Sequence, residues 1–446
     1  MGMMTLAHSK PPRRLATALR RPDAWYAGFA IYAGCVAAFS GPGLDHWWGI
    51  WAAGGYAAAA AVAFFYRSRA GQITALVVAV AGALVAPLTW LATQEPITPD
   101  SAVVARSGVL LLHHGSPYLP LAQLAHGGWL AYNPYLPVMA VFGLPKALGL
   151  PGILGDPRPL LAVVTFLLLF ATFLITTKAR AAELRAGTGR STALVLAALA
   201  IASPVMAFPL AEGITDPPVI AMTCLALALL TRTGHGAAGR RGGSWQAAVV
   251  LGVVCAMKYT AWPALAVLVV MVKVRDGGRA AVRFGVTAVG TAIALTAAFA
   301  PAALSSPDSL VQNTIAYPLG MTGARSPAQS PLPGHLLATL GPGGHTAAIV
   351  LLAVAGLALA VSLIVRPPAT PGRAATRIAL GLTALFALSP ATRFGYFCYP
   401  LALYGWVALT GAGRHIAPST RATADAGPEP ARPAPVDRPL ADAGQR

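Results

Sequence analysis

The sequence predicts an all-α polytopic membrane protein with about 12–13 transmembrane helices and an external juxtamembrane helix. The chain of 446 residues is 56% hydrophobic and only 10% charged, whereas soluble domains are about a quarter charged. Apolar runs of roughly 20 residues, the length of a membrane-spanning helix, recur along the chain. Basic residues gather in short segments between these runs, as the positive-inside rule requires of cytoplasmic loops.

The apolar runs give the positions of the expected spans. The first follows the basic stretch Lys10–Arg21 and lacks a small-residue cleavage site, so we expect an uncleaved helix rather than a signal peptide. Clear runs begin near Ala24, Trp47, Gln72, Leu160, Ser191, Pro217, Trp245, Ala261, Val282, His345, Arg377 and Phe394.

The basic clusters order these spans into three regions. Residues 1–23 are expected to be a basic cytoplasmic N-terminus, 24–411 the polytopic membrane domain, and 412–446 a disordered cytoplasmic tail of low complexity. Counting spans between clusters places loops 94–134 and 305–344 outside, together with the turns at Glu212–Asp216 and near Lys258. The cytoplasmic clusters lie at Lys10–Arg21, Arg67–Arg69, Lys178–Arg190, Arg232–Arg241, Lys273–Arg283, Arg366–Arg377 and from Arg414 onward.

One stretch leaves two alternatives open. An odd number of crossings must separate the external loop ending near Asn133 from the cluster at Lys178, yet two apolar segments lie between them. Either Tyr135–Leu150 lies along or dips into the membrane, or the Lys178–Arg190 loop violates the positive-inside rule.

Composition and motifs exclude several function classes. The net charge of +18 is explained by topology-setting loops, and no aromatic-interleaved basic stretch points to nucleic acid. Cys35, Cys224, Cys255 and Cys398 all lie in apolar segments without a CxxC pair, which indicates packed core residues. No zinc, P-loop or GxSxG motif occurs, so we expect neither a metal nor a cofactor.

The acidic residues narrow the search for a general base. Only fourteen are present, and the external face is expected to hold Asp45, Glu95, Asp100, Glu212, Asp216 and Asp308. Asp100 follows a span and opens the apolar segment Ser101–His114, which reads as a short interfacial helix ending at Gly115. A carboxylate there is either a helix N-cap or a catalytic base.

Two further carboxylates lie in the tight external turn Glu212–Asp216. Asp216 precedes Pro217-Pro218 and fits a helix cap. Glu212 sits near membrane depth, where an unpaired charge costs on the order of 3 kcal/mol. Structural and functional interpretations of Glu212 are both open.

The external cations are candidates for binding an anion. Lys258 interrupts an apolar run, so it either faces a polar cavity or extends to the interface. Arg393 is flanked by Phe394 and Tyr396, which suits a phosphate or a sugar but also an interfacial aromatic belt. The external histidines include the adjacent pair His113 and His114, which point apart on a helix and are weak evidence for a metal site.

Two stretches resemble the polyprenyl-phosphate-mannose-dependent mannosyltransferases, glycosyltransferase family 87 of the GT-C superfamily. The first contains Asp100, the Gly115–Tyr118 turn and Tyr132-Asn133-Pro134-Tyr135. In the family the next helix begins with a Tyr-x-Pro-Pro-like motif, whereas this chain has Tyr-Asn-Pro-Tyr. A second difference is that two extra spans precede Asp100. The second is Gly252–Pro263, an apolar helix with a Lys shortly before Pro.

The resemblance implies a GT-C-like helical bundle in the cell membrane, with an active site on the extracytoplasmic face. Asp100 would be the general base that lets an acceptor hydroxyl displace a hexose, expected to be mannose, from polyprenyl phosphate with inversion. The partners would be membrane lipid, this lipid-linked donor and a glycolipid or glycan acceptor. The residues expected to bind the donor phosphate or sugar are Lys258, Arg393, His113, His114, Tyr118, Glu212, Asp216 and Tyr259.

The rival hypothesis is a non-enzymatic transporter or flippase of lipid-linked sugar. Transporters usually carry internal repeats and broken helices at matching positions. No repeat is visible here, and the polar residues gather at one face rather than at mid-membrane. A long external loop with a carboxylate therefore favours the enzyme.

Overall fold

The computed structural model describes residues 21–93, 98–124, 126–184, 190–231, 242–302, 307–324 and 326–410. All of them belong to the compact unit Met1–Gly413. Nearly all of the expected basic N-terminus and the whole of the expected tail 412–446 lie outside the described residues. The described part is helical without a β-strand, and one isolated bridge joins Gln329 to Thr392.

The prediction of an all-α polytopic membrane protein is confirmed. Within the described ranges, five helices are long and apolar enough to cross a membrane. They are α3 (Leu44–Phe65), the continuous α4–η1–α5 (Arg69–Leu91), α10 (Pro157–Leu184), α16 (Gly278–Phe299) and α20 (Pro342–Val365). A sixth candidate is bent by 65° between α11 (Arg190–Ala202) and α12 (Pro204–Glu212). Pro204 explains the bend, because proline has no N–H to continue a helix.

Shorter helices run alongside these candidates. Their lengths of 13 to 18 residues fall below the roughly 20 residues of a straight span, so the total of about 12–13 crossings stays a prediction. They are α2 (Pro22–Phe39), α13 (Asp216–Thr231), α14 (Gly242–Cys255), α15 (Trp262–Asp276), α21 (Pro371–Leu388) and α22 (Cys398–Thr410).

The ambiguous stretch Tyr135–Leu150 contains no spanning helix. It forms η2 (Pro137–Gly143) and α9 (Leu144–Ala147), both packed against α6 (Pro99–His114). The backbones meet at Gly108 and Gly143, where a Cβ on Gly108 would lie 2.2 Å from the Gly143 carbonyl carbon. Of the two alternatives, the structure supports the one in which this segment does not cross, which leaves α10 as the single connection toward Lys178.

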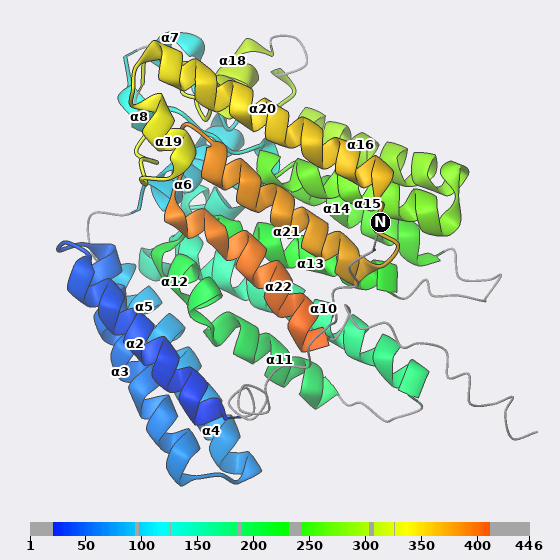
Figure 1. Cartoon of the computed structure of the whole chain (residues 1–446). Helices are drawn as coiled ribbons and strands as arrows, with labels where there is room; N and C mark the ends of the chain where they lie inside the picture. The colour runs from blue at the N-terminus through cyan, green and yellow to red at the C-terminus, as the bar shows by residue number, and fades with distance from the viewer. Residues whose placement is uncertain are drawn as a thin grey trace, which may run out of the picture. The chain divides into compact units, whose positions relative to one another are not determined.

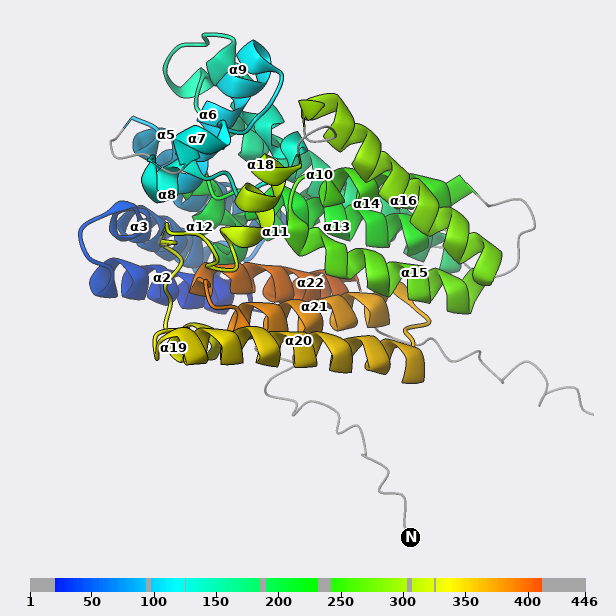
Figure 2. The same ribbon diagram turned by 90° about the horizontal axis from the view of Figure 1, so that it is seen from above.

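The short helices gather at one end of the long ones. Figure 1 shows α6, α7 (Leu121–Leu124), α8 (Gly128–Ala131) and α19 (Pro333–Ala338) near that end, and Figure 2 shows α20, α21 and α22 as neighbouring, roughly parallel rods. The turn between α12 and α13 and the break between α14 and α15 lie at the same end, because successive helices run in alternate directions. The basic turns around Arg67, Arg275 and Arg366 lie at the opposite end.

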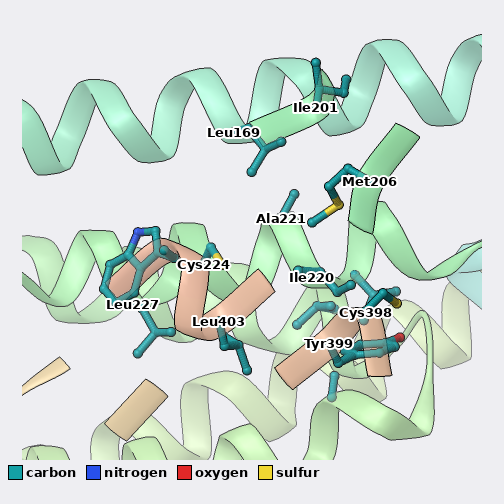
Figure 3. Close-up of a cluster of buried hydrophobic side chains, with 14 of the residues drawn as sticks. Leu169, Ile201, Met206, Ile220, Ala221, Cys224, Leu227, Cys398, Tyr399 and Leu403 are labelled. Atoms are coloured by element: carbon teal, nitrogen blue, oxygen red, sulfur yellow. The ribbon is translucent and has the colours of Figure 1, made fainter. Parts of the chain in front are cut away.

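A buried apolar cluster joins α10, α11, α12, α13 and α22 (Figure 3). Within a membrane such helices are held together by van der Waals packing rather than by removal of apolar surface from water. The cluster therefore fixes the position of α22 against the central helices. Its labelled members are Leu169, Ile201, Met206, Ile220, Ala221, Cys224, Leu227, Cys398, Tyr399 and Leu403.

Candidate functional site

Asp100 is the second residue of α6, and the helix is capped by another residue. The Thr98 hydroxyl accepts from the backbone N–H of Ser101 at 3.4 Å and donates to the backbone carbonyl of Glu212 at 2.7 Å. The alternative that Asp100 is simply the N-cap is therefore wrong. The cap position belongs to Thr98, which leaves the Asp100 carboxylate to make tertiary contacts.

Those contacts occupy both carboxylate oxygens of Asp100. Oδ1 accepts from the phenol of Tyr135, and Oδ2 accepts from Nη1 of Arg393 at 3.1 Å. Burial and then the Asp100 charge raise the pKa of Tyr135 well above its ordinary value. Burial alone would lower the pKa of Arg393, but the charge of Asp100 outweighs this effect and the pKa is raised. The phenol is thus a fixed donor and the guanidinium a fixed cation.

The isolated bridge places Arg393 at this site. Ser330 N–H donates to the Thr392 carbonyl at 2.9 Å, and Thr392 N–H donates to the Ala328 carbonyl at 2.9 Å. The buried Thr392 hydroxyl donates to the Phe386 carbonyl at 2.6 Å. Arg393 is therefore held between the end of α21 and the segment that follows residue 325.

Lys258 lies in the break between α14 and α15, as the sequence predicts. Its ammonium donates to Oδ1 of Asp216 and, at 3.4 Å, to the hydroxyl of Thr215. The Tyr399 phenol donates to the same Asp216 oxygen at 2.7 Å. Lys258 is 4% exposed and Asp216 1%, so the alternative in which Lys258 extends to the interface is wrong.

The side chain of Tyr135 connects the Lys258–Asp216 ion pair to Asp100. The Lys258 ammonium lies 5.3 Å from the ring centroid of Tyr135 and 5.7 Å from that of Tyr396. Burial alone would lower the pKa of Lys258, but the charges of Asp216 and Asp100 raise it. Asp100, Tyr135, Lys258 and Asp216 thus form one continuous polar cluster from four chain segments.

Buried Asn133 positions Tyr135 within the cluster. Its side-chain carbonyl accepts from the Tyr135 N–H at 3.1 Å, and its amide donates to the Ser107 hydroxyl at 3.0 Å and to the Pro117 carbonyl at 3.2 Å. Its own N–H donates to Oδ1 of Asn313 at 2.7 Å. The Tyr132–Tyr135 motif is thereby tied to α6 and to the second long loop.

A small cavity of about 70 Å³ lies over the cluster. Asp100, Lys258 and Arg393 supply its charged lining, and aromatic rings surround them. Its aromatic residues are Trp129, Tyr132, Tyr135, Tyr259, Tyr317 and Tyr396. Aromatic faces and a few convergent polar groups are typical of small-molecule and cofactor sites.

A much larger groove of about 2120 Å³ meets this cavity at Asp100 and Arg393. Its lining residues come from α2 and α4, from α22 and from the bent pair α11–α12, and Figure 1 labels these helices. Its lining is mainly apolar, and its volume exceeds the roughly 300–1,000 Å³ of common small-molecule pockets. From Cys398 to Leu409 the lining follows α22 for about 17 Å.

The predicted site residues fall into three groups. Lys258, Arg393, Asp216 and Tyr259 lie with Asp100 at the cavity or its ion pair, and Glu212 lines the groove. His113 and His114 are exposed at the other end of α6, about 20 Å from Asp100 along the helix. Tyr118 does not line the cavity but supports it from behind, because its buried hydroxyl donates to the Tyr135 carbonyl at 2.8 Å.

Sequence reasoning missed four side chains of the site or its support. Tyr135, Tyr396 and Tyr399 contact the charged residues. Arg158 is 1% exposed and donates from Nε to the Glu212 carbonyl at 3.4 Å. The departure from Tyr-x-Pro-Pro at Tyr135 was the available signal. In the parts of the chain that the structure describes, no group of three or more His, Cys, Asp or Glu could hold a metal ion.

Fold and site define a polytopic membrane protein with a carboxylate–cation cluster that opens on a large, mainly apolar groove. The chain belongs to glycosyltransferase family 87, whose family model matches residues 133–390, more than half of the sequence. The protein is therefore a glycosyltransferase. Asp216 and Lys258 lie inside the matched region, whereas Asp100 and Arg393 flank it. No curated protein and no solved structure matches the chain.

Proposed function

We propose that the protein transfers a hexose, mannose in our proposal, from polyprenyl phosphate to a glycolipid or glycan acceptor on the extracytoplasmic face of the cell membrane. The observation that carries the proposal is the Asp100–Arg393 contact at the junction of cavity and groove. A carboxylate base and a phosphate-binding cation meet where an apolar lipid chain and a polar acceptor could both arrive. Family membership favours this reading over the transporter or flippase.

The groove suits the polyprenyl chain of the donor. The groove is mainly apolar, so a lipid chain can pass into it from the equally apolar membrane and contact its side chains by van der Waals packing. The chain would leave its phosphate near Arg393, whose guanidinium can form paired hydrogen bonds with phosphate oxygens. The sugar would then lie beside Asp100.

The proposed reaction is a single displacement. Asp100 takes the proton of the acceptor hydroxyl, whose oxygen attacks the anomeric carbon while the bond from that carbon to the phosphate oxygen breaks. Polyprenyl phosphate leaves with the bonding electron pair, and Arg393 and Lys258 stabilise its charge. One displacement inverts the anomeric centre.

Donor binding also explains how Asp100 becomes available as a base. In the free protein both of its oxygens accept hydrogen bonds, from Tyr135 and Arg393. A phosphate at Arg393 competes with Asp100 for the guanidinium, which frees Oδ2 toward the acceptor. Tyr135 continues to hold Oδ1 and keeps the carboxylate oriented.

The test is transfer by purified protein in liposomes. Radiolabelled polyprenyl-phosphate-mannose is supplied with an acceptor lipid extract, and labelled product is separated from donor. We expect product with the wild type and about 10²–10³-fold less with Arg393→Gln, the range for losing one stabilising donor. The matched control Arg279→Gln, at an exposed arginine of α16, should match the wild type. Absence of wild-type product from any supplied lipid-linked hexose would refute the proposal.

A further inference from the structure

Helices α2, α3 and α4 add a wall to the groove from outside the matched family region. They precede residue 133, where the family model begins. The Tyr56 hydroxyl donates to the Ala202 carbonyl at 2.5 Å, and the rings of Trp48 and Phe208 lie 4.5 Å apart. These contacts fasten the N-terminal helices to the bent pair α11–α12. One wall of the groove is therefore built by a part of the chain that the family model does not cover.

This wall brings the Asp45 carboxyl into the groove lining, which also contains Asp100 and Glu212. Asp45 lies in the first turn of α3 and Glu212 is the last residue of α12. Tyr32 of α2 joins them, so three polar side chains come together in the lining of one groove. All three side chains line the groove, as Asp100 does.

Glu212 is left with an unused hydrogen-bonding atom. The residue is 5% exposed, and in the described part of the chain its Oε1 has no hydrogen-bond partner. A buried carboxyl oxygen without a partner is unfavourable. Because Glu212 lines the groove, a bound molecule could supply the missing donor.

We propose that Asp45, Glu212 and Tyr32 bind hydroxyl groups of the sugar headgroup on the lipid that fills the groove. Carboxyl and phenol groups together accept and donate directional hydrogen bonds, which matches a sugar with several hydroxyls. A phosphate would be repelled by two carboxyls and belongs at Arg393. The identity of the headgroup rests on the function proposed above, whereas the existence of a sugar subsite rests on the geometry.

The experiment compares two probes that differ only in the sugar. Binding of polyprenyl-phosphate-mannose and of bare polyprenyl phosphate is measured on purified, reconstituted protein. We expect Glu212→Gln to weaken binding of the sugar-bearing lipid by about 10- to 100-fold and to leave bare polyprenyl phosphate within about twofold. Asp45→Asn and Tyr32→Phe, at groove-exposed positions, give the same readout if the buried substitution prevents folding. Asp308→Asn, an exposed carboxylate on α18 (Asp308–Val311), is the matched control.

A parallel arm separates the two possible sources of the sugar. If donor binding is unchanged but the KM for a glycolipid acceptor rises by a similar factor, the subsite holds the acceptor sugar and the proposal stands. Equal loss of both probes would show that the residues only shape the groove, and no change in either arm would overturn the subsite. Because binding is read without turnover, a wild type that transfers no sugar refutes the proposed function but leaves this comparison readable.

Discussion

Replacing Lys258 by methionine should destabilise the protein strongly. The substitution keeps the length of the side chain but leaves the Asp216 carboxylate, which is 1% exposed, without its cation. Removing one partner of a buried ion pair costs about 3–5 kcal/mol. Tyr399 still donates to Asp216 at 2.7 Å, so we expect a value in the lower half of that range.

The second substitution tests the cause of the loss. In Lys258→Met/Asp216→Asn no charge is left buried, and the asparagine oxygen can still accept from Tyr399. We expect the double variant to recover most of the lost free energy of unfolding, because replacing both members of a buried pair is often close to neutral. The exposed Lys146 provides the control, and Lys146→Met should stay within about 0.5 kcal/mol of the wild type.

The assay is reversible unfolding of purified protein in mixed micelles, followed by tryptophan fluorescence. If Lys258→Met unfolds with the wild-type free energy, the ammonium does not compensate Asp216 and the described ion pair is wrong. If the double variant is as unstable as the single one, Lys258 stabilises the protein through packing on Tyr135 and Tyr396 instead.

Three other outcomes follow from the geometry. Thr98→Val removes the hydroxyl that binds the Glu212 carbonyl and should cost about 1–3 kcal/mol of unfolding free energy, with Thr74→Val on the exposed face of α4 as a near-neutral control. Gly108→Ala forces a Cβ into the Gly143 backbone and should lower the free energy of unfolding by at least about 1–3 kcal/mol, the cost of overpacking, which is read out as a lower yield of folded protein. Gly290→Ala, with no atom within 4 Å of the new Cβ, should leave the yield unchanged. Because the folded-state pKa of Lys258 is raised above its ordinary 10.5, its ion pair contributes fully below that pH and is lost only as the pH rises through the raised pKa. Unfolding of the wild type and of Lys258→Met/Asp216→Asn, which keeps neither buried charge, should therefore differ by the same free energy throughout about pH 6–9.

Apolar runs, and the glycine or charged residues that interrupt them, predicted much of the fold. The juxtamembrane helix was expected over Ser101–His114 and spans Pro99–His114, with Gly115 ending it at φ 66°. The break at Lys258 was expected because a single cation divides an apolar run that is long enough for two helices. These features are local, and so the sequence carries them.

The partners of the charged residues could not be predicted in the same way. Asp100 and Arg393 are 293 positions apart, and no local pattern pairs them. Tyr135 stands out in the sequence only as a departure from the family motif, and Tyr399 does not stand out at all, since a phenol shows its role only when its hydroxyl meets a carboxylate. The prediction that His113 and His114 belong to the site has the opposite problem. They lie on the same helix as Asp100 but at its other end.

Transfer measured with Asp100→Asn tests the central claim most directly. Reconstituted protein is given polyprenyl-phosphate-mannose and acceptor, and kcat is compared with that of the wild type and of Asp308→Asn. Removing the general base should lower kcat by about 10²–10⁴-fold while donor binding and protein yield are retained, and Asp308→Asn should behave as wild type. Wild-type turnover by folded Asp100→Asn would contradict the assignment of Asp100 as the base.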